Sequence, residues 1–90
     1  MSNSSRDVVV PNPQGLHARP IALIAQTAAR FRSALRIAAD GVEVDGKSVL
    51  QMMTLCAAQG TTLAISATGD DAEQLVAAIA QVVETGFGEM

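Results

Sequence analysis

Residues 8–20 read VVVPNPQGLHARP, and this stretch predicts how the fold begins. The three valines are β-branched and favour a strand, which the run of Pro and Gly at 11–15 must end. From His17 to Phe31 the apolar residues recur at helical spacing, and Pro20 is compatible only with the first turn of a helix. The chain is therefore expected to pass from a strand through a loop into a helix that begins at His17.

The next segments predict a hairpin and a short helix. Residues 34–45 alternate between apolar and polar side chains on either side of Asp40 and Gly41, a pair typical of two-residue hairpin turns. Ser48 and Gln51 follow with the spacing of a capping box, in which each side chain satisfies a free backbone N–H. A short helix should start at this point.

The C-terminal part predicts one more strand and one more helix. The short helix should end near Ala57, and residues 62–67 then alternate like a strand with one buried face. Asp70 and Asp71 open a helix whose apolar residues form one stripe, and Glu73 has the spacing for a second capping box. The resulting element order is β-α-β-β-α-β-α.

This order predicts an α+β fold in which helices cover one face of four strands, because each strand has only one apolar side. An open-faced sandwich is the simplest arrangement of this kind. A chain of 90 residues is enough for one hydrophobic core, so residues 1–90 are expected to form one domain with an ordered core from about 6 to 88. Alternation alone does not say which strands are neighbours.

The composition argues against several classes of function. Aromatic residues make up 2% of the chain and the net charge is −3, so neither base stacking nor broad attraction to phosphate backbones is expected. The single Cys56 lies in an apolar stretch and is expected to be a buried thiol, neither a disulfide partner nor a metal ligand. The polar N-terminus has no signal-like apolar core, and no segment has the length of a membrane span. We expect a cytoplasmic protein without nucleic-acid or membrane partners, metal or cofactor.

One short segment combines a nucleophile with a site for an anion. His17 precedes a helix, so a phosphate held on its side chain would meet the free N–H groups of Ala18 and Arg19 at the positive end of the helix dipole. A neutral imidazole nitrogen can attack phosphorus, and Arg19 offers a fork of donors to phosphate oxygens. Gly15 allows a tight turn beneath His17, and Pro20 stiffens the first helical turn. Local chemistry alone favours a plainer interpretation, in which His17 only caps the helix and Arg19 is solvated.

Two segments of the chain resemble a known family. The stretch GLHARP at 15–20 is followed by GKSVLQMMTL at 46–55, and together they resemble the HPr family of bacterial phosphocarriers. The resemblance implies a four-stranded antiparallel sheet with three helices on one face. It also implies a phosphoenolpyruvate-dependent phosphotransferase system, in which enzyme I phosphorylates Nδ1 of His17 and an enzyme IIA domain accepts the group for sugar uptake. Such a protein is a carrier rather than an enzyme, because its partners supply the catalysis.

The resemblance assigns roles to further residues. It implies that Arg19 stabilises the phosphate, and that Ser48 corresponds to a serine which an ATP-dependent kinase phosphorylates in many Gram-positive members. A helix cap before Gln51 explains Ser48 without a regulatory role. A monomer is expected. Partners are expected to dock on an apolar patch, with Leu50 as its exposed member and these residues in all: Leu16, Val49, Leu50 and Met53.

Departures from the family pattern leave alternatives open. Family members that serve sugar uptake often have lysines along the first helix, where this chain has Gln26 and Ala29, and Cys56 stands where a glycine is common. A nitrogen-branch or regulatory relative of the sugar carriers is therefore the first alternative. A second alternative, from a different class, is a non-catalytic interaction protein regulated by phosphorylation of Ser48.

Overall fold

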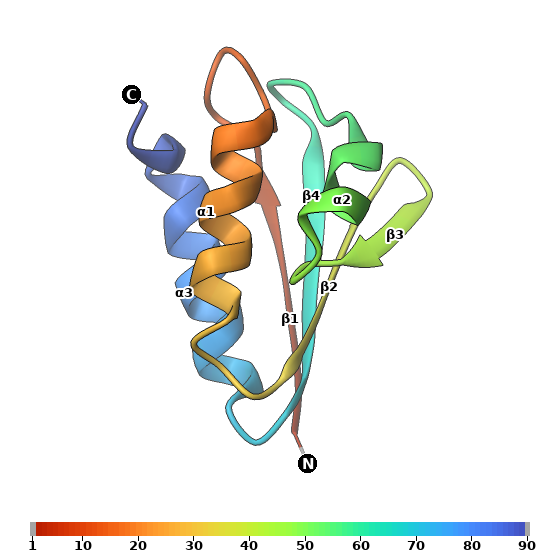
Figure 1. Ribbon diagram of the computed structural model, residues 1–90, viewed down its shortest axis with the longest axis vertical. Helices are drawn as coiled ribbons and strands as arrows, with labels where there is room; N and C mark the ends of the chain where they lie inside the picture. Colours follow the sequence, from red (N-terminus) through yellow and green to blue (C-terminus); the bar gives the residue numbers. More distant parts are fainter. Residues whose placement is uncertain (1, 90) are drawn as a thin grey trace.

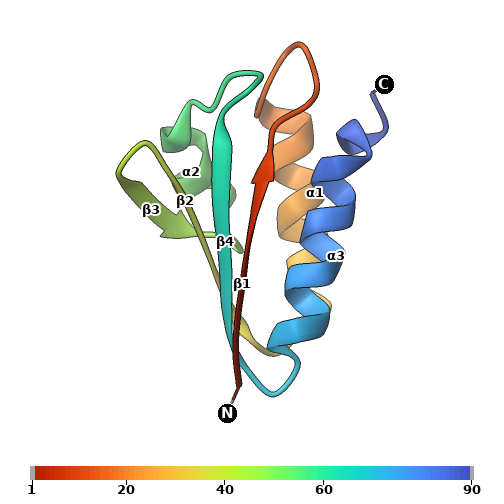
Figure 2. The same cartoon turned by 180° about the vertical axis from the view of Figure 1, so that it is seen from behind.

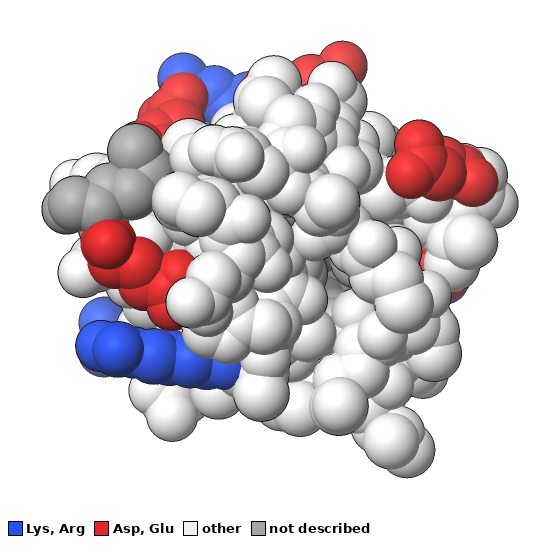
Figure 3. All heavy atoms as spheres, turned by 90° about the horizontal axis from the view of Figure 1, so that it is seen from above, with Lys and Arg blue, Asp and Glu red and all other residues white. Residues whose placement is uncertain are grey.

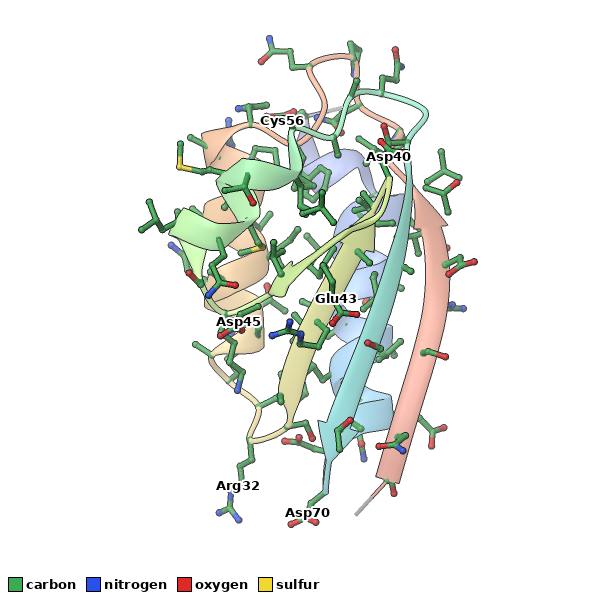
Figure 4. All side chains as sticks on the ribbon, turned by 90° about the vertical axis from the view of Figure 1, so that its right-hand side faces the viewer. Arg32, Asp40, Glu43, Asp45, Cys56 and Asp70 are labelled. Atoms are coloured by element: carbon green, nitrogen blue, oxygen red, sulfur yellow. The ribbon has the colours of Figure 1, made fainter. Side chains whose placement is uncertain are left out.

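A computed structural model describes residues 2–89, in which the strands form one antiparallel sheet. The sheet has the order β1-β4-β2-β3 and contains β1 (Ser2–Val9), β2 (Ala34–Ala39), β3 (Val42–Asp45) and β4 (Thr62–Gly69). The helices are α1 (Ala18–Ala28), α2 (Val49–Met52), which continues into the short 3₁₀ helix η1 (Met53–Leu55), and α3 (Ala72–Glu84). They lie on one side of the sheet in Figure 1 and Figure 2, and Figure 4 shows the strands of the uncovered face in front of them. The predicted α+β class and element order are confirmed.

The core lies between the sheet and the helices. Residues of β2 and β4 face each other in register, with Leu35 opposite Ala67 and Ile37 opposite Ile65. The largest fully buried side chains include Ile21, Ile24, Leu35, Ile37, Met52, Leu63, Ile65, Leu75 and Ile79. Within residues 2–89, no helix combines the length and apolar character needed to cross a membrane.

Strand β1 is longer than the sequence predicted. Its pairing with β4 begins at Ser2, opposite Gly69, and continues to Val9, opposite Thr62. The apolar run alone indicated a strand from Val8, and the ordered core was expected to begin at about residue 6. The polar residues before the run are drawn into the sheet because β4 offers them an unbroken row of backbone hydrogen-bond partners.

The turn between β2 and β3 agrees with its prediction. Asp40 has φ 51° and Gly41 has φ 82°, and the flanking residues Ala39 and Val42 form a pair in the sheet. Two consecutive positive φ angles are typical of a two-residue hairpin whose twist matches that of its strands.

The capping box at α2 is only half present. The Ser48 Oγ accepts a hydrogen bond of 3.2 Å from the Gln51 N–H, as predicted. The Gln51 Oε1 bonds instead to the Asp45 N–H at 3.0 Å. The Ser48 N–H already donates to the Asp45 carbonyl oxygen at 3.1 Å, so the glutamine has no free donor to satisfy at the cap. The helical segment ends at Leu55, slightly before Ala57.

The second predicted capping box, at Glu73, is wrong. The N-cap of α3 is Asp71, and its N–H is already occupied by the Ser33 Oγ at 3.1 Å. The Asp71 carboxylate accepts bonds from the Ser33 hydroxyl and from the backbone N–H groups of Arg32 and Ser33, at 3.0 and 2.9 Å respectively. The hydroxyl of Ser33, followed by the Arg32 N–H, lowers the pKa of Asp71 to about 2. Asp71 therefore ties the loop before β2 to the start of α3.

Cys56 is exposed, which corrects the prediction of a buried thiol. It follows η1 with φ 50° and ψ 39°, a left-handed conformation that ends the helix. The reversal of the backbone turns the side chain away from the core, although its sequence neighbours are apolar. Figure 4 shows Cys56 at the end of the molecule opposite Arg32 and Asp70.

Candidate functional site

The loop before α1 is held against the segment that follows α2. The Leu16 N–H donates to the Ala57 carbonyl oxygen at 2.8 Å. Gly15 has φ +70°, and a Cβ on it would lie 2.6 Å from the same oxygen. Only glycine permits this close approach, because any side chain would displace backbone atoms. The start of α1 is thereby positioned by a contact between two distant loops.

His17 is the N-cap of α1, as the sequence predicted. Its backbone is extended (φ −93°, ψ −171°), and its side chain makes no capping hydrogen bond. The Ile21 N–H donates to the His17 carbonyl oxygen at 3.1 Å, which is the first bond of the helix. The N–H groups of Ala18 and Arg19 come before this bond, and Pro20 has no N–H. Two backbone donors are thus available beside an imidazole whose side chain is 34% exposed.

The imidazole contacts a residue at the other end of the chain. His17 Nε2 lies 2.8 Å from Glu89 Oε2. The other carboxylate oxygen, Glu89 Oε1, accepts a hydrogen bond of 2.8 Å from Asn12 Nδ2. Asn12 is completely buried, and its Nδ2 also donates to the Gly15 carbonyl oxygen at 2.8 Å. Asn12 therefore connects Glu89 to the loop that carries His17.

An open pocket of about 450 Å³ lies next to His17. Its lining residues are Pro13, Gln14, His17, Arg19 and Glu89. Arg19 is exposed on α1, so its guanidinium is accessible from the pocket. Figure 3 views this end of the molecule and shows the charged side chains at its margins, with a mostly uncharged surface between them.

An apolar patch is exposed on α2 and η1. We use this name for Val49, Leu50 and Met53, which are 41%, 78% and 53% exposed. Leu50 is the most exposed of them, as predicted. Leu16 does not belong to the patch, because it is 6% exposed and packs in the core. The Leu16 N–H bond to Ala57 draws this residue inward.

Ser48 lies at the start of α2, immediately before the apolar patch. Its hydroxyl accepts the Gln51 N–H, and the residue is partly exposed. The predicted structural role as a cap is therefore present in the fold.

The chain is similar to known proteins in both sequence and structure. The family described as "PTS HPr component phosphorylation site" matches residues 4–85 of this chain. The chain belongs to the HPr family. A phosphocarrier protein HPr from Xylella fastidiosa is 35% identical over 83 residues, which cover 92% of this chain and 93% of that protein. The crystal structure of an HPr from Thermoanaerobacter tengcongensis superimposes with a TM-score of 0.92 at 38% identity, covering 97% of this chain and 98% of that one.

HPr-like sequences also occur inside longer proteins. A multiphosphoryl transfer protein from Haemophilus influenzae is 33% identical over 84 residues, which cover 90% of this chain and 17% of that protein. The similarity to HPr therefore extends over nearly the whole of this chain, well beyond the two segments on which the resemblance rested.

Two site residues of this HPr-family chain were not predicted from its sequence. Asn12 and Glu89 are separated by 77 positions, and Glu89 and His17 by 72. The available signals were Asn12, a polar residue amid Pro and Gly at 11–15, and Glu89, an acidic residue two positions after Phe87. Neither signal identifies a partner, because no local pattern reports which segments meet in the fold.

Proposed function

We propose that this HPr-family protein accepts a phosphoryl group on Nδ1 of His17 and passes it to a second protein. The observation that carries the proposal is the position of His17 as a partly exposed N-cap, with the N–H groups of Ala18 and Arg19 beside it. An anion at this point meets the positive end of the α1 dipole. Within residues 2–89, the hydrogen bond of the imidazole is made at Nε2, and Nδ1 is left to react.

The chemistry of the transfer needs few groups from this chain. The Nδ1 lone pair attacks the phosphorus of a phosphorylated donor, a P–N bond forms, and the bond from donor to phosphorus breaks with its electron pair on the donor. The phosphoryl oxygens are stabilised by the Ala18 and Arg19 N–H groups and by the Arg19 guanidinium. No general base is required, because the attacking nitrogen carries no proton. The reverse displacement by an acceptor releases the group.

The donor and acceptor that fit this proposal are enzyme I and an enzyme IIA domain of the phosphotransferase system, with sugar uptake as the process served. The apolar patch is the proposed docking surface for both partners, since exposed apolar side chains beside a reactive group are typical of transient interfaces. We take residues 1–90 to be one domain that acts as a monomer. Helix α1 and its C-cap have Gln26 and Ala29 where sugar carriers often have lysines, which leaves a nitrogen-branch or regulatory role as the alternative to sugar uptake.

The proposal is tested with phosphoenolpyruvate, a bacterial enzyme I and either the wild-type protein or His17→Ala. The chain contains one histidine, so a phosphohistidine has a single location. We expect the intact mass of the wild type to increase by one phosphoryl group that brief acid treatment removes, and no increase for His17→Ala. Absence of labelling in the wild type with its cognate enzyme I would overturn the carrier function.

A second candidate is an interaction protein controlled at Ser48. The observation that favours it is that Ser48 immediately precedes the exposed patch, so a phosphate there would place negative charge at the edge of a docking surface. In that case His17→Ala would bind partners as tightly as the wild type does. Phosphorylation of Ser48 by an ATP-dependent kinase would lower the affinity of the protein for its partners. Partner binding measured for both proteins, with and without phosphorylation, separates the two functions.

A further inference from the structure

The carboxylate of Glu89 has a position from which it can control the chemistry of His17. We propose that Glu89 is a positioning residue, which holds the imidazole proton on Nε2 and keeps the Nδ1 lone pair free for phosphoryl transfer. The inference rests on the proposed phosphocarrier function and extends it to a residue that the sequence did not single out.

The contact between the two side chains determines the tautomer of the imidazole. The separation of 2.8 Å between His17 Nε2 and Glu89 Oε2 is that of a charge-assisted hydrogen bond. An ionised carboxylate can only accept, so Nε2 must carry the hydrogen. A neutral imidazole has one N–H, and therefore Nδ1 is the nitrogen with the free lone pair.

Glu89 is itself held in place by a buried group. Its side chain is 17% exposed, and Oε1 accepts a hydrogen bond from Asn12 Nδ2. The same Asn12 nitrogen donates to the Gly15 carbonyl oxygen. One buried amide thus sets the position of the carboxylate relative to the loop that ends at His17. In metal sites, carboxylates that accept a hydrogen bond from a ligating histidine likewise fix the tautomer and orientation of its ring.

The backbone conformation of residues 86–88 also holds Glu89 in position. Gly86, Phe87 and Gly88 have successive φ angles of 68°, 58° and 75°, all left-handed. A phenylalanine in this conformation is strained, yet Phe87 is 3% exposed and packs in the core. A Cβ on Gly88 would meet nothing within 4 Å. Glycine is therefore favoured here by the positive φ angle and not by a lack of room for a side chain. Burial of Phe87 anchors a tight turn that returns the chain to the start of α1.

The carboxylate also matches the charge that develops during transfer. When the P–N bond forms at Nδ1, the Nε2 proton stays on the ring and the imidazole gains positive charge. The negative charge of Glu89 faces that nitrogen and stabilises the product. Glu89 lies on the Nε2 side of the ring, so it does not occupy the place of the phosphoryl group.

The experiment uses protein labelled with ¹⁵N at histidine, which gives one pair of imidazole nitrogen signals because the chain has a single histidine. Two-bond ¹H–¹⁵N spectra, recorded at a pH where the ring is neutral, report the ratio of the two tautomers. The proteins compared are the wild type, Glu89→Ala, Glu89→Gln and Glu84→Ala. The last is the matched control, since Glu84 is an exposed carboxylate at the end of α3.

We expect Glu89→Ala to shift the tautomer ratio about fivefold toward Nδ1–H, the change for a hydrogen bond of about 1 kcal/mol in a partly exposed site. Its initial rate of phosphorylation by enzyme I should fall roughly three- to tenfold, because the developing positive charge has lost its partner. Glu89→Gln has one carbonyl oxygen for two donors, and with that oxygen on Asn12 Nδ2 its NH2 faces Nε2. It should therefore shift the tautomer ratio toward Nδ1–H and lower the rate, as Glu89→Ala does. Glu84→Ala should match the wild type in both measurements.

Two results would overturn the role of Glu89. One is a tautomer ratio in Glu89→Ala equal to that of the wild type, and the other is an equal shift in Glu84→Ala. Failure of the wild type to be phosphorylated is a separate outcome, which overturns the carrier function and with it the effect on rate. The tautomer ratio is measured without phosphorylation, and it still decides whether Glu89 holds the Nε2 proton.

Discussion

Gly15 is the residue whose backbone conformation brings His17 to the start of α1. Gly15→Ala must adopt φ +70° and place a Cβ 2.6 Å from the Ala57 oxygen. We expect the free energy of unfolding to fall by about 2–5 kcal/mol, from a left-handed penalty of about 1–2 and an overpacking cost of about 1–3 kcal/mol. Urea denaturation measures the loss, and the rate of phosphorylation should fall with it because the loop must move.

The matched control for this change is Gly41→Ala in the hairpin turn. Gly41 has φ +82°, and a Cβ there would meet nothing within 4 Å. Its substitution should cost only the backbone penalty of about 1–2 kcal/mol and leave phosphorylation unchanged. Equal effects of the two substitutions would mean that the close approach of Gly15 to Ala57 contributes nothing to the free energy of unfolding or to the rate of phosphorylation.

Asp71 gives the stability a dependence on acid pH. Its pKa is lowered from 3.8 to about 2 in the folded protein, first by the Ser33 hydroxyl and then by the Arg32 N–H. A depressed pKa stabilises the fold above the unfolded value, and the contribution is lost as the pH falls from 3.8 toward 2. Asp71→Asn should therefore differ most from the wild type at neutral pH and approach it through this window. Unfolding measured between pH 7 and pH 2 tests the sign, with exposed Asp70→Asn as the control.

Among the elements, α2 depends most on its cap, because a helix of four residues gains little from propagation. Ser48→Ala removes the acceptor for the Gln51 N–H and should destabilise the protein by about 1 kcal/mol. Ser48→Asp keeps an acceptor at a helix N-terminus and should lie within about 0.5 kcal/mol of the wild type. Thermal or urea unfolding separates the two, and equal losses would show that the cap bond is not the cause.

The element boundaries differ from their predictions where a partner distant in sequence supplies hydrogen bonds. Strand β1 begins at Ser2 because β4 pairs with its polar residues. Gln51 bonds to Asp45 instead of the cap, and Asp71 bonds to the loop at Ser33 instead of leaving its N–H to Glu73. Periodicity predicts the type of each element because it reports the buried face. It does not report which donors are already occupied.

At the scale of the whole molecule, the Leu16 N–H bond to Ala57 brings the loop that carries His17 next to the segment that follows α2 and η1, where the apolar patch is exposed. Leu50→Ser should raise the KM of enzyme I for this protein about fivefold, the effect of losing about 1 kcal/mol at a docking contact, with kcat within about twofold. Stability should change by less than about 0.5 kcal/mol, because Leu50 is 78% exposed.

The control for this prediction is Val9→Ser. Val9 is 52% exposed on β1, which forms the edge of the sheet opposite β3. The Val9→Ser substitution removes an exposed apolar side chain at a site outside the patch, and it should leave the KM unchanged. An increase for Val9→Ser, or none for Leu50→Ser, would contradict docking at this surface.

By itself the sequence determined the α+β class, the order of the elements, the hairpin turn and His17 as the residue that begins a helix. These features follow from local periodicity, turn residues and the geometry of a helix N-terminus, which act over a few positions. The tertiary structure alone decided the burial of Leu16, the exposure of Cys56 and the contact of Glu89 with His17 and Asn12. Each of these depends on which distant segments meet, and their meeting is set by packing of the whole core rather than by any local pattern.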